Sequence, residues 1–128
     1  YKFKGVDKTA LCTDAMRGAG MPDGESILGS LTNGQKVIIE DGVAKLPDRS
    51  AFAGSVATAD RLVRTMINIA GIPLIDAIRM ITLTPARILH VDSQKGSLEE
   101  GKDADIVIFD NQINVTTTIS KGHVIYNQ

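Results

Sequence analysis

Asp14 is the acidic residue whose place in the sequence best suits acid–base chemistry. It follows the apolar run Thr9-Ala10-Leu11-Cys12-Thr13, which predicts a short strand over residues 9–13, and it precedes a glycine-rich loop over residues 15–24. In α/β barrel enzymes the carboxyl ends of buried strands carry acids and bases, because the loops there form the substrate entrance. From spacing alone, the simpler interpretation of Asp14 is a loop residue that closes a local turn.

The composition narrows the class of protein. The 128 residues are 43% hydrophobic and 23% charged, which predicts a globular domain with a single core. With 14 basic and 15 acidic residues, a nucleic-acid or membrane partner is not expected. No apolar stretch reaches the ~20 residues that cross a bilayer. A lone cysteine, Cys12, fits a reducing compartment, so we expect a cytoplasmic protein.

Two hairpins are predicted from turn signals. Asp41-Gly42 and Lys121-Gly122 each separate two apolar stretches. Ahead of the second hairpin, four consecutive apolar residues at 106–109 predict a strand that is covered on both faces. The strands expected in and before these hairpins are 36–40, 43–46, 106–109, 115–120 and 123–126.

Three helices are predicted between the hairpins. Apolar residues recur at helical spacing over residues 57–70, and Gly71 ends this helix. Pro73 begins the second helix, and Thr84 is the expected N-cap of a short third helix with Pro85 at its first position.

The order of elements is strand, hairpin, helices, strand, hairpin. One strand followed by helices is a single β/α unit, whereas a complete eight-unit barrel needs roughly 250 residues. We therefore expect an α/β chain that is the C-terminal fragment of a larger protein.

Two stretches, LTPARIL over residues 83–89 and KGSLEEGKDADIV over 95–107, resemble the C-terminal part of the amidohydrolase superfamily. In that superfamily the chain leaves the last helix of a TIM barrel and enters a small flanking β-sandwich. The resemblance implies that residues 1–90 are the last β/α unit of the barrel, with an inserted hairpin and the C-terminal helices. Residues 91–128 would then be strands of the β-sandwich.

Two shorter stretches narrow the substrate. Thr13-Asp14-Ala15-Met16 with Gly18, and Phe52-Ala53-Gly54-Ser55 before a helix, resemble the N-acetylglucosamine-6-phosphate deacetylase family, as does the hairpin between them. This resemblance implies a hydrolase of amino-sugar catabolism that removes acetate from N-acetylglucosamine 6-phosphate.

The same resemblance implies roles for individual residues. Asp14 would be the proton acceptor and donor, while a divalent metal such as zinc polarises the carbonyl and activates a water. Phe52, Ala53 and Gly54 would line the pocket near the sugar and its acetyl group. The family holds its metal with a glutamate and two histidines from earlier strands, so we expect no metal ligand in this chain and no activity from the chain alone.

Other interpretations remain open. The chain could be a non-catalytic folding or interaction module, or belong to an amidohydrolase of another substrate such as a cyclic amide. Unpaired strand edges favour a homodimer. Phe52 could simply be a core residue at a helix entry, and Gly18 a flexible linker residue.

Overall fold

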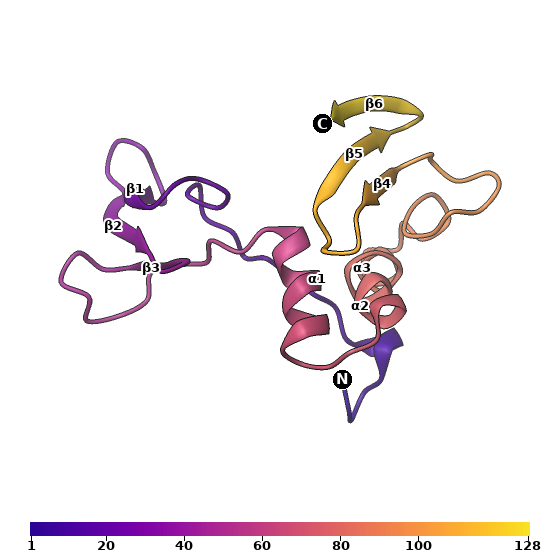
Figure 1. The fold of residues 1–128 in the computed structure, drawn as a ribbon, viewed down its shortest axis with the longest axis horizontal. Helices are drawn as coiled ribbons and strands as arrows, with labels where there is room; N and C mark the ends of the chain where they lie inside the picture. The colour runs from indigo at the N-terminus through magenta and orange to yellow at the C-terminus, as the bar shows by residue number, and fades with distance from the viewer. The chain divides into compact units, whose positions relative to one another are not determined.

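The computed structural model describes Tyr1–Gln128 as an α/β chain with two three-stranded antiparallel sheets (Figure 1). The expected α/β class is thereby confirmed. None of the helices is both long and apolar enough to span a bilayer. The elements in chain order are η1 (Val6–Lys8), β1 (Gly24–Leu28), β2 (Gln35–Glu40), β3 (Val43–Lys45), α1 (Ala59–Asn68), α2 (Leu74–Ile81), α3 (Leu83–Ile88), β4 (Ile106–Phe109), β5 (Val115–Ser120) and β6 (His123–Asn127).

The chain forms two compact units, which are described separately. One is the continuous stretch Thr13–Ala59, called here the insert unit, and the other combines Tyr1–Cys12 with Asp60–Gln128 and is called the helical unit. The division expected from the sequence, at residue 90, stays a prediction.

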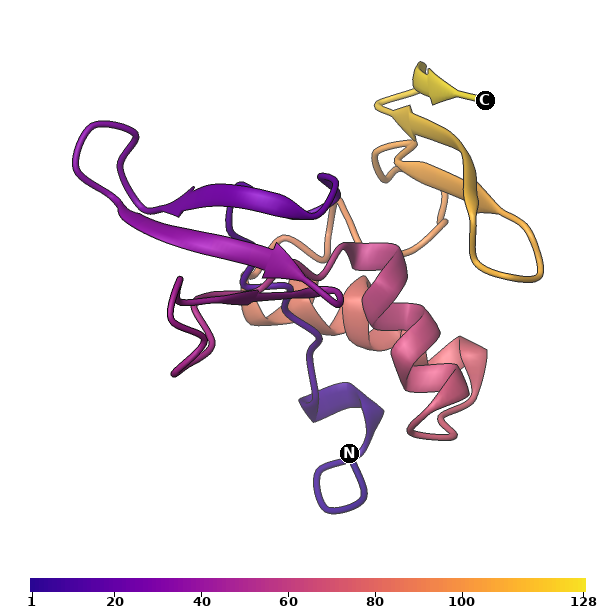
Figure 2. The ribbon, with the colours of Figure 1, turned by 60° about the vertical axis from the view of Figure 1, so that its left-hand side comes forward.

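The insert unit contains the sheet β1–β2–β3, with both neighbouring pairs antiparallel (Figure 2). The hairpin predicted around Asp41-Gly42 is confirmed, and both turn residues have positive φ (54° and 71°), as in a type I′ turn. Strand β1 was not expected from the sequence. Its sequence Gly-Glu-Ser-Ile-Leu lacks a strong apolar alternation, and it forms because β2 offers it a hydrogen-bonding edge.

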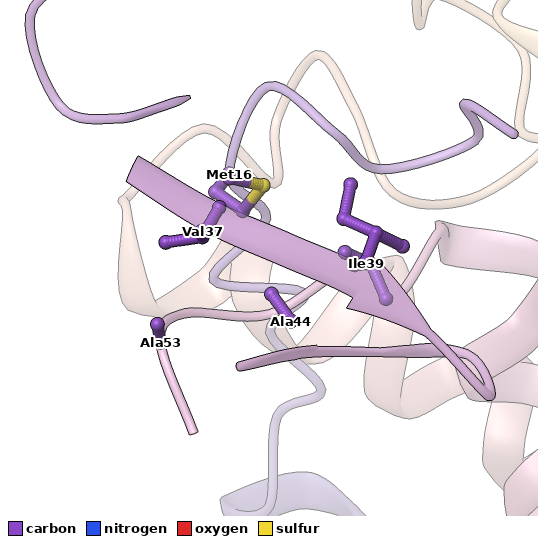
Figure 3. Close-up of a cluster of buried hydrophobic side chains, with 6 residues drawn as sticks. Met16, Val37, Ile39, Ala44 and Ala53 are labelled. Atoms are coloured by element: carbon purple, nitrogen blue, oxygen red, sulfur yellow. The ribbon is translucent and has the colours of Figure 1, made fainter. Parts of the chain in front are cut away.

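The core of the insert unit lies along one face of β2. Val37 and Ile39 are buried while their neighbours on the strand are less so, which is the period-two pattern of a sheet with one covered face. Figure 3 shows this core around β2. Its buried members are Met16, Val37, Ile39, Ala44, Ala53 and Val56.

The three helices of the helical unit confirm the predicted order, with shifted ends. Gly71 has a φ of 66° and lies beyond the end of α1, as expected, and Pro73 is the N-cap of α2. The predicted cap of the third helix is wrong, because the N-cap is Thr82 and Thr84 lies inside α3. Thr84 is 1% exposed, and its hydroxyl donates to the Val6 carbonyl at 2.9 Å instead of capping the helix.

The strand predicted over residues 9–13 is not formed. The apolar run is there, but a strand also needs a neighbour to pair with. In this chain the Leu11 N–H donates to the Met80 carbonyl at 2.8 Å, near the end of α2, and no ladder follows. Cys12 within the run is exposed.

The closing hairpin predicted around Lys121-Gly122 is confirmed, and β4 adds the third strand of this sheet. The expectation that 106–109 is covered on both faces is wrong, because Val107 and Ile108 are each about half exposed. The Lys95 ammonium joins the segment before β4 to the sheet, since it donates to Asp103 at 2.8 Å and to Asp105 at 2.5 Å. The Asp105 carboxylate in turn accepts the Lys121 N–H at the hairpin turn.

Candidate functional site

Asp14 lies in an irregular segment at the start of the insert unit, and its side chain is exposed. Its φ is 45°, in the left-handed region that aspartate adopts more readily than most residues. The Asp14 carboxylate forms no hydrogen bond or ion pair within the chain. It is therefore accessible to water and to a ligand, and the turn-closing role considered from spacing alone is not seen.

A short parallel pairing holds the Asp14 segment against the segment that follows the hairpin. Ala15 and Ser55 form a parallel bridge, and the Met16 N–H donates to the Ser55 carbonyl at 2.8 Å. On the N-terminal side of this bridge the next residues are Asp14 on one segment and Gly54 on the other. Two segments about forty residues apart in the sequence thus meet at neighbouring register positions.

Gly54 is at a position where a side chain would be difficult to place. Its φ is 88°, and a Cβ there would lie 3.1 Å from the Leu28 Cδ1 and 3.4 Å from the Met16 Cγ. Glycine alone combines that conformation with so close an approach at little cost. The preceding Ala53 is 5% exposed, and its N–H donates to the Ala44 carbonyl at 2.9 Å. Residues 53 and 54 are therefore fixed against β3 and against the Met16 segment.

Phe52 is 77% exposed, so the interpretation of Phe52 as a core residue is wrong for this chain. Its backbone forms an antiparallel bridge with Lys45, on the edge of β3 that does not pair with β2. A large apolar ring held outside the core by a fixed backbone is available to contact a ligand. All four residues expected at the site, Asp14, Phe52, Ala53 and Gly54, lie in the insert unit.

Gly18 proves to be a packing residue rather than a linker. It is buried, and a Cβ at this position would lie 2.1 Å from the Ile39 Cδ1 and 2.9 Å from the Met16 sulfur. The lack of a side chain at Gly18 lets the loop after Asp14 lie close to β2 without displacing Ile39 or Met16. The neighbouring Arg17 donates to the Gly29 carbonyl at 2.6 Å, which ties the same loop to the end of β1.

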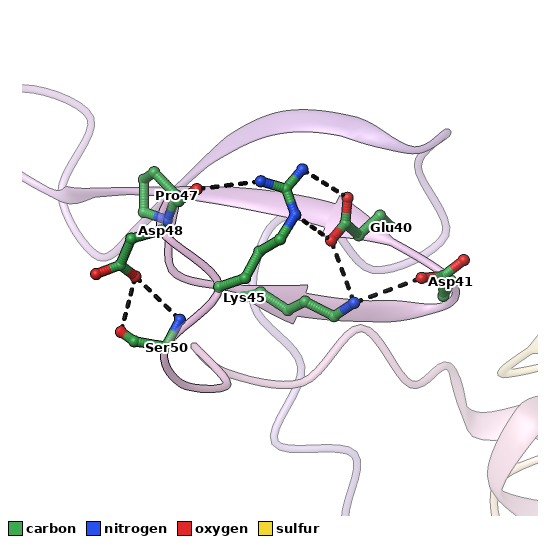
Figure 4. Close-up of polar contacts among 7 residues, drawn as sticks. Glu40, Asp41, Lys45, Pro47, Asp48 and Ser50 are labelled. Atoms are coloured by element: carbon green, nitrogen blue, oxygen red, sulfur yellow. Dashed lines mark hydrogen bonds and ion pairs between the residues drawn. The ribbon is translucent and has the colours of Figure 1, made fainter.

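A cluster of charged residues on the hairpin was not recognised in the sequence. Glu40, at the end of β2, accepts from the Lys45 Nζ at 3.2 Å and from Arg49 through Nε at 2.9 Å and Nη2 at 3.1 Å (Figure 4). The hydrogen bonds from Arg49 and then Lys45 hold the pKa of Glu40 below its ordinary value, and Glu40 raises the pKa of Lys45. The sequence signal that could have found this cluster is an acid at the last strand position with cations five and nine residues later.

The residues of this chain do not fit a divalent metal site. No three side chains of the metal-ligating types His, Cys, Asp and Glu lie together. A divalent metal in a protein is held by three or more such groups, or by oxygen ligands with waters. The exposed His90 lies in the turn after α3, and the exposed His123 lies on β6, both in the helical unit. Neither has ligating neighbours.

The insert unit thus places the accessible Asp14 carboxylate near an apolar, glycine-containing segment. The model of the amidohydrolase family matches residues 7–125. The chain therefore belongs to the amidohydrolase family, as its sequence stretches indicated.

Individual relatives resemble nearly the whole chain. The N-acetylglucosamine-6-phosphate deacetylase of Lysinibacillus sphaericus is 40% identical over 97% of this chain and 30% of that protein. The N-acetylgalactosamine-6-phosphate deacetylase of Escherichia coli O157:H7 is 39% identical over 92% of this chain and 30% of that protein.

A solved structure gives the same relation. The N-acetyl-D-glucosamine-6-phosphate deacetylase of Mycobacterium smegmatis, an aspartate-to-alanine variant in complex with N-acetyl-D-glucosamine-6-phosphate, superposes with a TM-score of 0.83 at 31% identity. The match covers 96% of this chain and 32% of that chain. The chain thus spans about a third of the length of these relatives.

Proposed function

We propose that this chain supplies the acid–base carboxylate and one wall of the sugar pocket in a metal-dependent deacetylase of N-acetylglucosamine 6-phosphate. One observation carries the proposal. Asp14 and Gly54 lie next to the same backbone bridge, in a chain whose relatives bear the name of that activity.

Asp14 is the proposed catalytic residue. Its carboxylate would remove a proton from a water molecule as the water oxygen attacks the acetyl carbonyl carbon. It would return the proton to the sugar nitrogen as the carbon–nitrogen bond breaks, which gives acetate and the free amino sugar phosphate. An exposed, unpaired carboxylate is available for both transfers.

Residues 52–54 are the proposed substrate-binding segment. The exposed ring of Phe52 offers apolar area, and the bare backbone at Gly54 allows the closest approach to a ligand beside Asp14. Ala53 would contribute mainly through its fixed backbone, since its own side chain is buried.

The metal expected for this family would be held by groups outside these 128 residues, because the chain offers no ligand set of its own.

The finer fold assignment is also part of the proposal. Residues 1–90 would complete a TIM barrel, where the apolar run 9–13 would pair as its last strand, and 91–128 would join the flanking β-sandwich. The chain alone is expected to release no acetate.

The test is acetate release by the full-length protein with a divalent metal and N-acetylglucosamine 6-phosphate. Asp14→Asn keeps the size and loses the base, so kcat should fall by about 10³-fold or more. Asp23→Asn, an exposed aspartate of the same loop, is the matched control and should retain wild-type rates. Equal rates for wild type and Asp14→Asn would refute the catalytic role.

N-acetylgalactosamine 6-phosphate is the second candidate substrate. The relative from Escherichia coli O157:H7 that carries this name is about as similar to the chain as the relative named for the glucosamine compound. The two sugars differ at one hydroxyl group, so kcat/KM for each, measured side by side, identifies the preferred substrate.

A homodimer and a cytoplasmic location complete the proposal. Exposed apolar side chains on the second sheet support association between copies, and the lone cysteine supports a reducing compartment. Sedimentation of the full-length protein over a range of concentrations tests whether it forms a homodimer. A strictly monomeric species would favour the simpler view that the rest of the polypeptide covers these residues. The apolar residues concerned are Val107, Ile108, Val124, Ile125 and Tyr126.

A further inference from the structure

We propose that the ion pair between Glu40 and Arg49 positions residues 52–54 beside Asp14 and so sets how tightly the acetylated sugar binds. The inference rests on the proposed function and adds two positioning residues to it. Neither residue is placed in contact with substrate or with the reacting atoms.

A short loop after β3 leads into residues 52–54. The chain leaves β3 at Lys45 and returns at Phe52, which pairs with the same residue. Backbone bonds close the loop, from the Leu46 N–H to the Ala51 carbonyl at 2.9 Å and from the Arg49 N–H to the Leu46 carbonyl at 2.8 Å. The loop therefore decides the position at which Phe52 re-enters the sheet.

A side-chain contact between Arg49 and Glu40 fixes this loop. Arg49 has a φ of 62°, and from this conformation its guanidinium reaches both oxygens of Glu40 while Nη1 donates to the Pro47 carbonyl at 3.4 Å. A two-point contact between guanidinium and carboxylate fixes orientation as well as distance. The loop is thereby attached to the end of β2, as Figure 4 shows. Asp48 closes the next turn by accepting from the Ser50 N–H and hydroxyl.

The ion pair should affect the position of the loop more than the stability of the sheet. Exposed ion pairs contribute little to the free energy of unfolding, and Arg49 is mostly exposed. The core residues Val37, Ile39 and Ala44 are buried, so their contacts should persist when the pair is removed. Loss of the pair should therefore loosen the loop and residues 52–54 without unfolding the sheet.

The first measurement is amide hydrogen exchange in the 128-residue chain. In Arg49→Ala the Ala53 amide, which bonds to the Ala44 carbonyl, should exchange about tenfold faster, while the Val37 amide is unchanged. The matched control is Lys36→Ala, which removes an exposed cation from the same strand as Glu40. The conservative variant Arg49→Lys keeps a positive charge beside Glu40 without the two-point contact, and should recover part of the Ala53 protection.

The second measurement is kinetics of the full-length protein. Arg49→Ala should raise KM for the sugar phosphate about tenfold and leave kcat within about twofold, because the pair affects the binding segment and not the acid–base group. Arg49→Lys should lower KM again relative to Arg49→Ala, because it keeps the charge. If Glu40 and Arg49 only stabilised the fold, KM would not change in a variant whose melting temperature equals that of the wild type.

The outcomes are distinguishable. Unchanged Ala53 exchange, or faster exchange with an unchanged KM, overturns the inference. If the wild-type protein releases no acetate and the exchange effect is present, the proposed function fails while the positioning of residues 52–54 by Glu40 and Arg49 stands.

Discussion

Gly18 packs directly against Ile39, so closely that a Cβ on Gly18 would lie 2.1 Å from the Ile39 Cδ1 atom. This contact attaches the loop after Asp14 to the central strand of the insert unit. Gly18→Ala should destabilise that unit by about 1–3 kcal/mol, because the added methyl group overpacks the core. Native-state hydrogen exchange of the β2 amides measures the loss.

Ile39→Val provides the control for this contact. It removes the Cδ1 atom and should cost about 1 kcal/mol by itself. In the double variant the new methyl group has room. The loss of stability in the double variant should therefore be smaller than the sum of the losses in the two single variants. Strict additivity would contradict the overlap.

The Thr84 hydroxyl should contribute to the stability of the helical unit. Thr84→Val keeps the shape of the side chain but leaves the Val6 carbonyl without its donor, which should cost about 1–3 kcal/mol. Thr84→Ser keeps the hydroxyl and is the control. Urea unfolding measures both variants, and the Val variant should be the less stable of the two. The opposite order would mean that the bond to Val6 contributes nothing.

Substitution of Phe52 should weaken substrate binding and leave the stability of the fold nearly unchanged. Because it is 77% exposed, Phe52→Ala should change the free energy of unfolding of the chain by no more than about 0.5 kcal/mol. In the full-length protein the same change should raise KM for the sugar phosphate about tenfold. Phe109→Ala is the control of the same residue type, since Phe109 packs against the helical core and its loss should cost stability. A large loss of chain stability in Phe52→Ala would contradict the exposed position.

The Lys95–Asp105 ion pair predicts how stability depends on pH. The hydrogen bond from Lys95 and the backbone N–H of Lys121 hold the pKa of Asp105 below its ordinary value of 3.8. The stabilisation by Asp105 is therefore complete above that ordinary value and is lost as the pH falls through the lower pKa of the folded state. Asp103 and then Asp105 raise the pKa of Lys95 above 10.5, so that residue's contribution is lost only as the pH rises through its raised value.

Asp105→Asn tests this dependence. The urea midpoint of wild type should fall between about pH 5 and about pH 2 more steeply than that of the variant. About 1 M salt should reduce the difference, because Lys95 and Asp105 are partly exposed and their attraction is screened. Parallel pH profiles would contradict the contribution of the pair.

Local signals in the sequence were sufficient for much of the fold. Asp41-Gly42 predicted its hairpin because both residues tolerate positive φ, and Gly71 marked the end of α1 for the same reason. Tertiary context decided the failures. The run 9–13 has the apolar content of a strand but no partner, and Thr84 has the type of an N-cap but bonds to Val6.

The candidate site was accessible to sequence analysis only in part. Asp14 and residues 52–54 were named from their resemblance to a family, but their proximity depends on the Ala15–Ser55 bridge, which no local pattern encodes. The Glu40–Arg49 pair was missed because a charged residue in a strand or a loop carries no periodic signal of its partner.

The Ala15–Ser55 bridge has a consequence for how this protein can vary. It joins the two ends of the insert unit, so the sheet between them is a closed excursion of the chain. Residues can be gained or lost in the turn between β1 and β2, beyond the Gly29 carbonyl that accepts from Arg17, without changing the distance between the two segments that carry Asp14 and Gly54. The insert is thus a place where related sequences can differ in length, and where a reporter peptide can be inserted, while the spacing of these two residues is kept.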